Sequence, residues 1–143
     1  MKDNYFVDTN VLVYWFDKSE QKKNKKAHSL IRDSKHTSNL FISPQVLNEF
    51  ISVVTKKIEH PLPFEHLKEI LSIISDVFYI SPITPRNSFS AIDLKLKYQF
   101  SYWDCLIIAS ALENGCNRLY TEDLQDNRKI EEKLDIINPF RLL

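Results

Sequence analysis

The sequence predicts an α/β fold in which a mostly parallel sheet is covered by helices on both faces. Short apolar runs of strand character alternate along the chain with longer segments whose apolar residues recur at helical spacing. This alternation is typical of parallel sheets built from strand, helix and strand units. The 143 residues include a single glycine and neither an internal repeat nor a low-complexity tract. A chain of this size can bury one hydrophobic core, so we expect a single domain over residues 1–143.

In the first half of the chain, a short run of apolar residues bounded by polar ones predicts a strand at 5–8. Apolar residues at helical spacing then predict helices over about 10–17 and 21–34. The run LFIS predicts a second strand at 40–43. The helix expected at 44–58 begins with a proline, which the first helical turn tolerates.

The second half of the chain continues the alternation. Residues 64–76 place leucines and isoleucines at helical spacing, and strand character returns at 77–81 before two prolines. One helix is expected over about 85–98 and another over 102–114, where an Asn-Gly pair marks the helix end. The remaining strands are expected at 118–121 and 134–138.

Composition indicates a soluble cytoplasmic protein that is not embedded in a membrane. No apolar stretch approaches the length that crosses a bilayer, and the N-terminal MKDNYFVD has no apolar signal core. Cys105 and Cys116 are too few for a disulfide scaffold. The 19 basic and 19 acidic residues cancel, so overall charge does not predict nucleic-acid binding. The lysine cluster at 22–26 is either a solvated helix face or a rim that attracts phosphate.

Four carboxylates follow expected strands or lie on apolar helix faces. Asp8 follows the first expected strand, and Asp123 comes just after the strand at 118–121. Glu49 and Asp104 have apolar neighbours three or four positions away in their helices, which predicts inward-facing positions for both. Because the carboxyl ends of parallel strands meet at one edge of a sheet, we expect all four acids to converge there.

Each of these acids alone also has a purely structural interpretation. Asp8 is a favoured helix N-cap, Ser101 to Asp104 fits a capping box, and Asp123 could start a short helix. Glu49 could pair with a lysine such as Lys56 or Lys57. Four independent caps or pairs have no reason to gather at one edge, however, and crowded carboxylates repel one another unless a cation lies among them. Oxygen ligands without a nearby cysteine or histidine suit Mg2+ or Mn2+.

Four motifs give the chain a resemblance to a known family. At FVDTNVLVYWFD, NEF, YWDCLIIASALENGCNRLYTEDLQ and INPF, the sequence resembles PIN-domain ribonucleases of the bacterial VapC toxin type. The match runs in the expected order over nearly the whole chain, and the set is much more specific than any one of its parts. The resemblance implies a three-layer PIN-like fold with a mostly parallel sheet of about five strands flanked by helices.

The resemblance also implies an activity, a site and partners. The implied activity is Mg2+-dependent cleavage of RNA, with Mn2+ as the alternative ion, leaving a 5′-phosphate and a 3′-hydroxyl. The implied partners are RNA, a cognate antitoxin protein and a second copy of the chain in a homodimer. Glu122 is the adjacent alternative for the fourth acid. The implied metal-binding and catalytic residues are Asp8, Glu49, Asp104 and Asp123, supported by the polar residues Asn10 and Thr121.

Three other interpretations stay open. An aspartyl phosphotransferase of the haloacid dehalogenase type also places its nucleophile after the first strand, but its motif needs a second Asp where this chain has Asn10. A PIN nuclease of RNA processing would carry the same site without being a toxin. A non-catalytic interaction domain would use the acids as caps and would show no specific Mg2+ stabilisation. Metal-independent catalysis by histidine is disfavoured by the surface-like contexts of His28, His36, His60 and His66.

Overall fold

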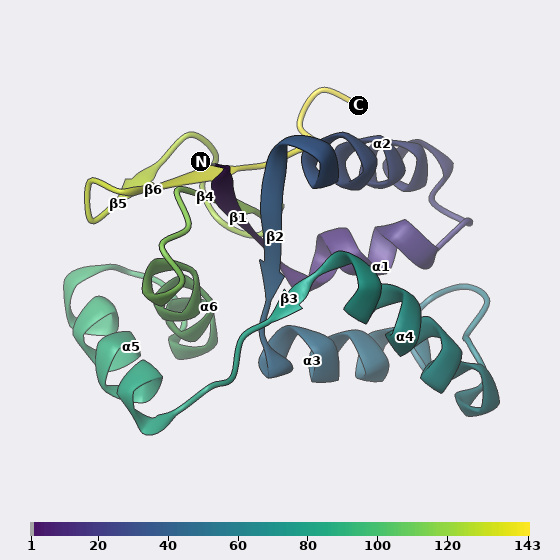
Figure 1. Ribbon diagram of the computed structural model, residues 1–143, viewed down its shortest axis with the longest axis horizontal. Helices are drawn as coiled ribbons and strands as arrows, with labels where there is room; N and C mark the ends of the chain where they lie inside the picture. Colours follow the sequence, from purple (N-terminus) through teal and green to yellow (C-terminus); the bar gives the residue numbers. More distant parts are fainter. Residues whose placement is uncertain (1) are drawn as a thin grey trace.

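Six strands form a single sheet in the order β3-β2-β1-β4-β6-β5, and helices flank it (Figure 1). The computed structural model describes residues 2–143. The strands are β1 (Asp3–Val7), β2 (Ser38–Ile42), β3 (Tyr79–Ile80), β4 (Arg118–Tyr120), β5 (Lys129–Ile130) and β6 (Leu134–Ile137). The helices are α1 (Thr9–Phe16), α2 (Gln21–Thr37), α3 (Pro44–Val54), α4 (Leu67–Val77), α5 (Pro85–Lys97) and α6 (Tyr102–Glu113), with a 3-10 turn η1 (Phe64–His66) before α4. The predicted α/β fold with a mostly parallel sheet is confirmed.

The central strand β1 brings the carboxyl ends of distant segments together. It runs parallel to β2 on one side and to β4 on the other, so that Phe6 lies opposite both Phe41 and Leu119. The backbone N–H of Asp8 donates to the carbonyl of Tyr120 at 3.0 Å, which continues the pairing beyond β1. The residues that follow β1 and β4 therefore leave the sheet side by side, as the sequence predicts.

Several elements differ from their predicted bounds. Helix α2 runs on to Thr37, and β1 and β2 begin at Asp3 and Ser38, two residues before their predicted starts. Helix α3 ends at Val54 and not at residue 58: the backbone N–H of Lys56 donates to the carbonyl of Val53, only three residues back, and the N–H of Leu62 donates to the carbonyl of Val54. Strand β3 has only two residues, since α4 continues to Val77. Strand β5 was not expected: it has two residues, and its antiparallel pairing with β6 depends on a tight turn in which Glu131 and Glu132 adopt positive φ.

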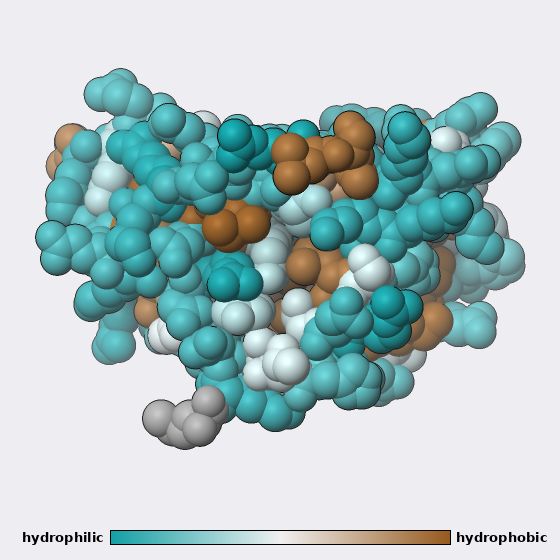
Figure 2. Space-filling model, turned by 90° about the horizontal axis from the view of Figure 1, so that it is seen from above, coloured by the Kyte–Doolittle hydropathy of each residue, from teal (hydrophilic) through white to brown (hydrophobic). Residues whose placement is uncertain are grey.

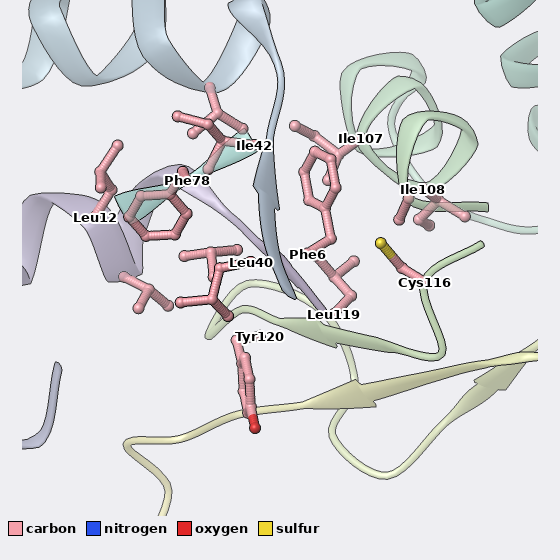
Figure 3. Packing of buried hydrophobic residues seen from close by; sticks show 14 of the residues in the cluster. Phe6, Leu12, Leu40, Ile42, Phe78, Ile107, Ile108, Cys116, Leu119 and Tyr120 are labelled. Carbon is pink, nitrogen blue, oxygen red and sulfur yellow. The ribbon is translucent and has the colours of Figure 1, made fainter. Parts of the chain in front are cut away.

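The core lies on both faces of the central strands. Phe6 of β1 points toward Ile107 of α6, and Cys116 lies beside Ile108 of the same helix (Figure 3). Both cysteines are free and buried, and burial raises the pKa of the Cys116 thiol to about 12, so this thiol stays protonated at neutral pH. The core thus holds the edge strands and α6 in fixed relation to β1.

Among residues 2–143, none of the helices combines the length and the apolar character that crossing a bilayer requires.

Candidate active site

Asp8 lies at the junction between β1 and α1, with its side chain 5% exposed. One carboxylate oxygen accepts a hydrogen bond from the backbone N–H of Thr9 at 2.7 Å, and the other accepts one from the hydroxyl of Thr121 at 2.8 Å. Asp8 therefore does cap α1, as the structural interpretation expects. Its second bond to Thr121 ties it to the segment that follows β4, which a helix cap alone does not require.

The electrostatics of Asp8 differ from those of an ordinary helix cap. Burial raises the pKa of Asp8 from 3.8 to about 6, the hydrogen bonds from Thr121 and Thr9 oppose that rise, and the charges of Asp123 and Asp104 add to it. Three acids from three separate segments are thus close enough to repel one another. The predicted convergence of Asp8, Asp104 and Asp123 is present in the fold.

Asp104 lies in the first turn of α6, which Ser101 caps by accepting a hydrogen bond from the backbone N–H of Asp104 at 3.1 Å. Its own carboxylate is left partly exposed. Burial raises the pKa of Asp104, hydrogen bonding to Ser101 lowers it, and the charge of Asp123 raises it again. The capping pattern expected at Ser101 is therefore real, and the Asp104 carboxylate interacts both with Ser101 and with the charge of Asp123.

Asp123 is exposed and sits in an irregular segment after β4, so the interpretation that it starts a helix is wrong. The side-chain amide of Asn10 donates to the Asp123 carboxylate at 3.0 Å and to the Thr121 hydroxyl at 3.4 Å. The Thr121 hydroxyl also accepts from the backbone N–H of Asp123 at 3.1 Å. Asn10 and Thr121 thus hold Asp123 beside Asp8, in the supporting positions that the resemblance implies.

Glu49 lies at the rim of this group and not inside it. Its side chain is exposed on α3, because the buried stripe of that helix passes through Val46 and Phe50 and leaves position 49 at its margin. The predicted inward-facing position of Glu49 is therefore wrong. Its one hydrogen bond among the described residues is a long one, 3.5 Å, from the Thr9 hydroxyl. Within residues 2–143 it forms no ion pair with Lys56 or Lys57.

Glu122, the alternative fourth acid, is directed toward α1 and α2. The hydroxyl of Tyr14 donates to one of its carboxylate oxygens at 2.8 Å, and the ammonium group of Lys23 lies 3.0 Å from the other. This contact is not predictable from the sequence, because no local spacing relates positions 14, 23 and 122. Lys23 is therefore taken up by an internal ion pair, whereas Lys22, Lys25 and Lys26 of the same cluster are exposed.

The charge balance at this edge is unusual. None of the ion pairs among the described residues includes Asp8, Glu49, Asp104 or Asp123. Oxygen-only donors with uncompensated negative charge fit a hard divalent cation. Over residues 2–143, however, no three Asp, Glu, His or Cys side chains are already arranged so that they could hold a metal ion. The donor chemistry fits such an ion, and binding would require the carboxylates to draw closer together.

Two hollows meet at Glu49. One, of about 480 Å3, is lined by residues that include Thr9, Asn10, Glu49, Lys57 and Asp123. The other, of about 610 Å3, is largely apolar and is lined by Pro44, Gln45, Asn48, Glu49, Ile83, Trp103 and Leu106. Together the two hollows form an open groove with two arms, which Glu49 and Asp123 border, whereas Asp8 and Asp104 line neither arm.

Two aromatic residues line the groove, Trp103 in the apolar arm and Tyr14 in the other. Trp103 is 63% exposed in the apolar arm of the groove. Tyr14 packs edge-on against Phe140, and Trp15 packs against Phe78. A further cavity, between α2 and the C-terminal tail, contains none of the four acids. The face on which α2 and that tail lie is mostly hydrophilic, with scattered apolar patches (Figure 2).

A family model for the PIN domain matches residues 5–132. No curated protein matches the sequence. Similar solved structures include VapBC2 from Rickettsia felis bound to a DNA fragment from its promoter, with 19% identity, a TM-score of 0.68 and coverage of 94% of this chain and 99% of that one. A toxin-antitoxin complex from Klebsiella pneumoniae is 18% identical, with a TM-score of 0.69 and coverage of 94% and 97%. VapC20 of Mycobacterium tuberculosis, a toxin that cleaves the sarcin-ricin loop, is 16% identical, with a TM-score of 0.65 and coverage of 83% and 89%.

Proposed function

Because this chain belongs to the PIN domain family, we propose that it is a metal-dependent endoribonuclease that hydrolyses RNA phosphodiester bonds. The observation that supports this most directly is the gathering of Asp8, Asp104 and Asp123 at one edge of the sheet, close enough to raise the pKa of Asp8 and without a basic partner among the described residues. Such crowding lowers the stability of the fold, and a bound cation relieves it.

Asp8 and Asp104 are the principal metal ligands in this proposal, and Glu49 and Asp123 complete the site directly or through water. Mg2+ is the ion we propose, with Mn2+ as the alternative, because both ions accept donor sets made only of oxygens. Such an ion, when bound, supplies an activated water and stabilises the leaving oxygen of the phosphodiester. The hydroxyl of Thr121 orients Asp8, and the amide of Asn10 orients Asp123.

The open groove supports a polymeric substrate. Its two arms share Glu49, so a chain that occupies both would run past Glu49 without having to end there. Trp103 offers an exposed ring in the apolar arm, where an unpaired base can stack. Lys57 in the other arm offers a positive charge to the phosphate backbone.

We further propose that the chain is the toxin of a VapBC-type toxin-antitoxin system. The support comes from the similar structures, which include toxin-antitoxin complexes from Rickettsia felis and Klebsiella pneumoniae. A cognate antitoxin would be the protein partner. A homodimer is supported by α5, which exposes Phe89, Ile92 and Leu96 to 72%, 49% and 84% on one side of the helix.

The test is cleavage of a structured RNA in Mg2+ by the wild-type protein and by Asp104→Asn, with growth of an expressing bacterium as a second measurement. We expect EDTA and Asp104→Asn each to abolish cleavage, and Mg2+ or Mn2+ to restore it to the wild type. Cleavage that persists in EDTA after removal of contaminating nucleases would contradict the metal-dependent mechanism. Cleavage without growth arrest would favour an RNA-processing nuclease, and growth arrest by Asp104→Asn would rule out cleavage as its cause.

A further inference from the structure

Glu122 is the neighbour of Asp123 in sequence, yet its carboxylate is held from the opposite side by α1 and α2. Tyr14 donates to one oxygen at 2.8 Å, and Lys23 lies 3.0 Å from the other. Both oxygens of the Glu122 carboxylate therefore have a donor within the protein. The Lys23 and Glu122 side chains are 32% and 22% exposed, so the pair is partly shielded from water.

The donors are themselves fixed in place. The ammonium group of Lys23 lies 3.2 Å from the Tyr14 hydroxyl and 4.7 Å from the centre of the Tyr14 ring. That ring packs edge-on against Phe140, with ring centres 5.0 Å apart. Contacts of this kind limit the rotamers of both side chains before Glu122 binds them, so little further entropy is lost in forming the pair.

Glu122 and Asp123 are turned in different directions by this arrangement. The backbone N–H of Glu122 donates to the side-chain oxygen of Asn10 at 3.3 Å, and the amide nitrogen of Asn10 donates to Asp123 at 3.0 Å. Asn10 therefore binds residues 122 and 123 on the side of the acids, and Lys23 and Tyr14 bind Glu122 on the side of α2. The segment cannot turn about its axis without breaking one set of contacts.

We propose that Lys23 and Tyr14 are positioning residues for the metal site. By binding Glu122, they hold residues 121–123 in the register that presents Asp123 to Asp8, and they keep the Glu122 carboxylate from competing for the ion. The inference rests on the proposed function. It also identifies Asp123, and not Glu122, as the acid that faces the site.

The experiment is a calorimetric titration of Mn2+ into the wild-type protein, Lys23→Met and Tyr14→Phe, at a temperature where thermal melting shows each to be folded. We expect Lys23→Met to weaken metal affinity by roughly 10-fold to 100-fold, the range typical of groups that support metal ligands. Saturating metal should restore most of its kcat for RNA. Lys23→Arg keeps the pairing charge and should bind Mn2+ nearly as the wild type does.

The chain offers a matched control. Lys97 pairs with Glu131 at 2.6 Å, and the hydroxyl of Tyr98 donates to the same carboxylate at 2.9 Å. Among the ion pairs of the described residues, Lys97 and Glu131 pair only with each other and with none of the acids of the site. Like the site around Glu122, this group consists of a lysine, a tyrosine and a glutamate, and Lys97→Met removes its lysine. It should leave Mn2+ affinity unchanged, so that a loss in Lys23→Met cannot be ascribed to the removal of an ion pair as such.

Glu122→Gln decides between positioning and direct ligation. If Glu122 only anchors the segment, Glu122→Gln should match Lys23→Met, and the double variant should bind Mn2+ no more weakly than either single one. If Glu122 were a ligand, Glu122→Gln would lose binding as completely as Asp123→Asn, which would overturn the inference. Wild-type affinity in Lys23→Met would overturn it as well and leave the nuclease proposal standing. A wild-type protein that neither binds Mn2+ nor cleaves RNA would overturn both.

Discussion

Asp8, Asp104 and Asp123 form what we call the acid edge of the sheet. Their carboxylates and those of the C-terminal region have opposite surroundings. Asp126 accepts a hydrogen bond from the backbone N–H of Asn138 and another from Arg141, both at 2.8 Å, and these bonds lower the pKa of Asp126. At the acid edge, burial and like charges raise the pKa values of Asp8 and Asp104. The first arrangement favours the ionised carboxylate, and the second disfavours it.

The C-terminal hairpin repeats the first pattern. Hydrogen bonds from Lys97 and Tyr98 lower the pKa of Glu131, and Lys129 lies 3.0 Å from Asp135. Acids that serve stability are thus given partners in this protein. The carboxylates of the acid edge form no ion pair among the described residues, although the chain contains 19 basic residues that could have supplied one. The difference indicates that the edge is maintained for a ligand and not for the stability of the fold.

The largest expected effect comes from removing the charge at the centre of the edge. Asp8→Asn should reduce RNA cleavage by at least about 100-fold, a loss typical of deleting one group that stabilises the transition state. Its metal-free melting temperature should not fall, because the amide removes a buried charge. Cleavage rates and thermal melting measured on the same preparation check both statements. Full activity at unchanged melting would exclude a metal-binding role for Asp8.

A change of pH should have an effect of intermediate size, on the free energy of unfolding. Folding raises the pKa of Asp8 from 3.8 to about 6, so the folded protein binds the Asp8 proton more tightly than the unfolded chain does. This tighter binding stabilises the fold fully below about pH 3.8, and the stabilisation is lost as the pH rises through about 6. At 1.36 kcal/mol per pKa unit, the loss approaches about 3 kcal/mol. The lowered pKa values of Asp126 and Glu131 keep their contributions in place above about pH 4.5, the ordinary pKa of the Glu131 carboxyl.

We therefore expect the metal-free protein to be less stable at pH 7 than at pH 5. Chemical unfolding in EDTA at the two values measures the difference, and Asp8→Asn serves as the control because it lacks the titrating carboxylate. Mg2+ should restore stability at pH 7 in the wild type alone. A metal-free protein that is equally stable at both values would show that burial of Asp8 has no such cost.

The smallest effect should come from the paired region. Arg141→Ala removes a partner of Asp126 in a pair whose arginine is 58% exposed. Surface pairs of this kind contribute roughly 0–1 kcal/mol, so urea unfolding should shift only slightly. RNA cleavage should be unchanged, because Arg141 lines the cavity beside α2 and not the groove at the acids. A large loss of cleavage would mean that the two regions are coupled.

Sequence patterns predict the acid edge because its main residues follow local rules. Asp8 and the segment of Asp123 each come directly after a strand, and the parallel register of β1 with β4 then brings them together. The exposure of Glu49 was not predictable from apolar spacing, since a helix period of 3.6 residues leaves some positions at the margin of the stripe. The pairing of Lys23 with Glu122 depends on how α2 packs against α1 and so brings Lys23 to the segment after β4, which no local pattern encodes.

The topology of β1 also has a consequence during synthesis. Asp8 is made well before Asp104 and Asp123, and β4 must pair with β1 before the three acids can meet. A nascent polypeptide that stops short of residue 123 cannot assemble the acid edge. Synthesis of Asp123 and the pairing of β4 with β1 therefore both precede any binding of a ligand to this edge.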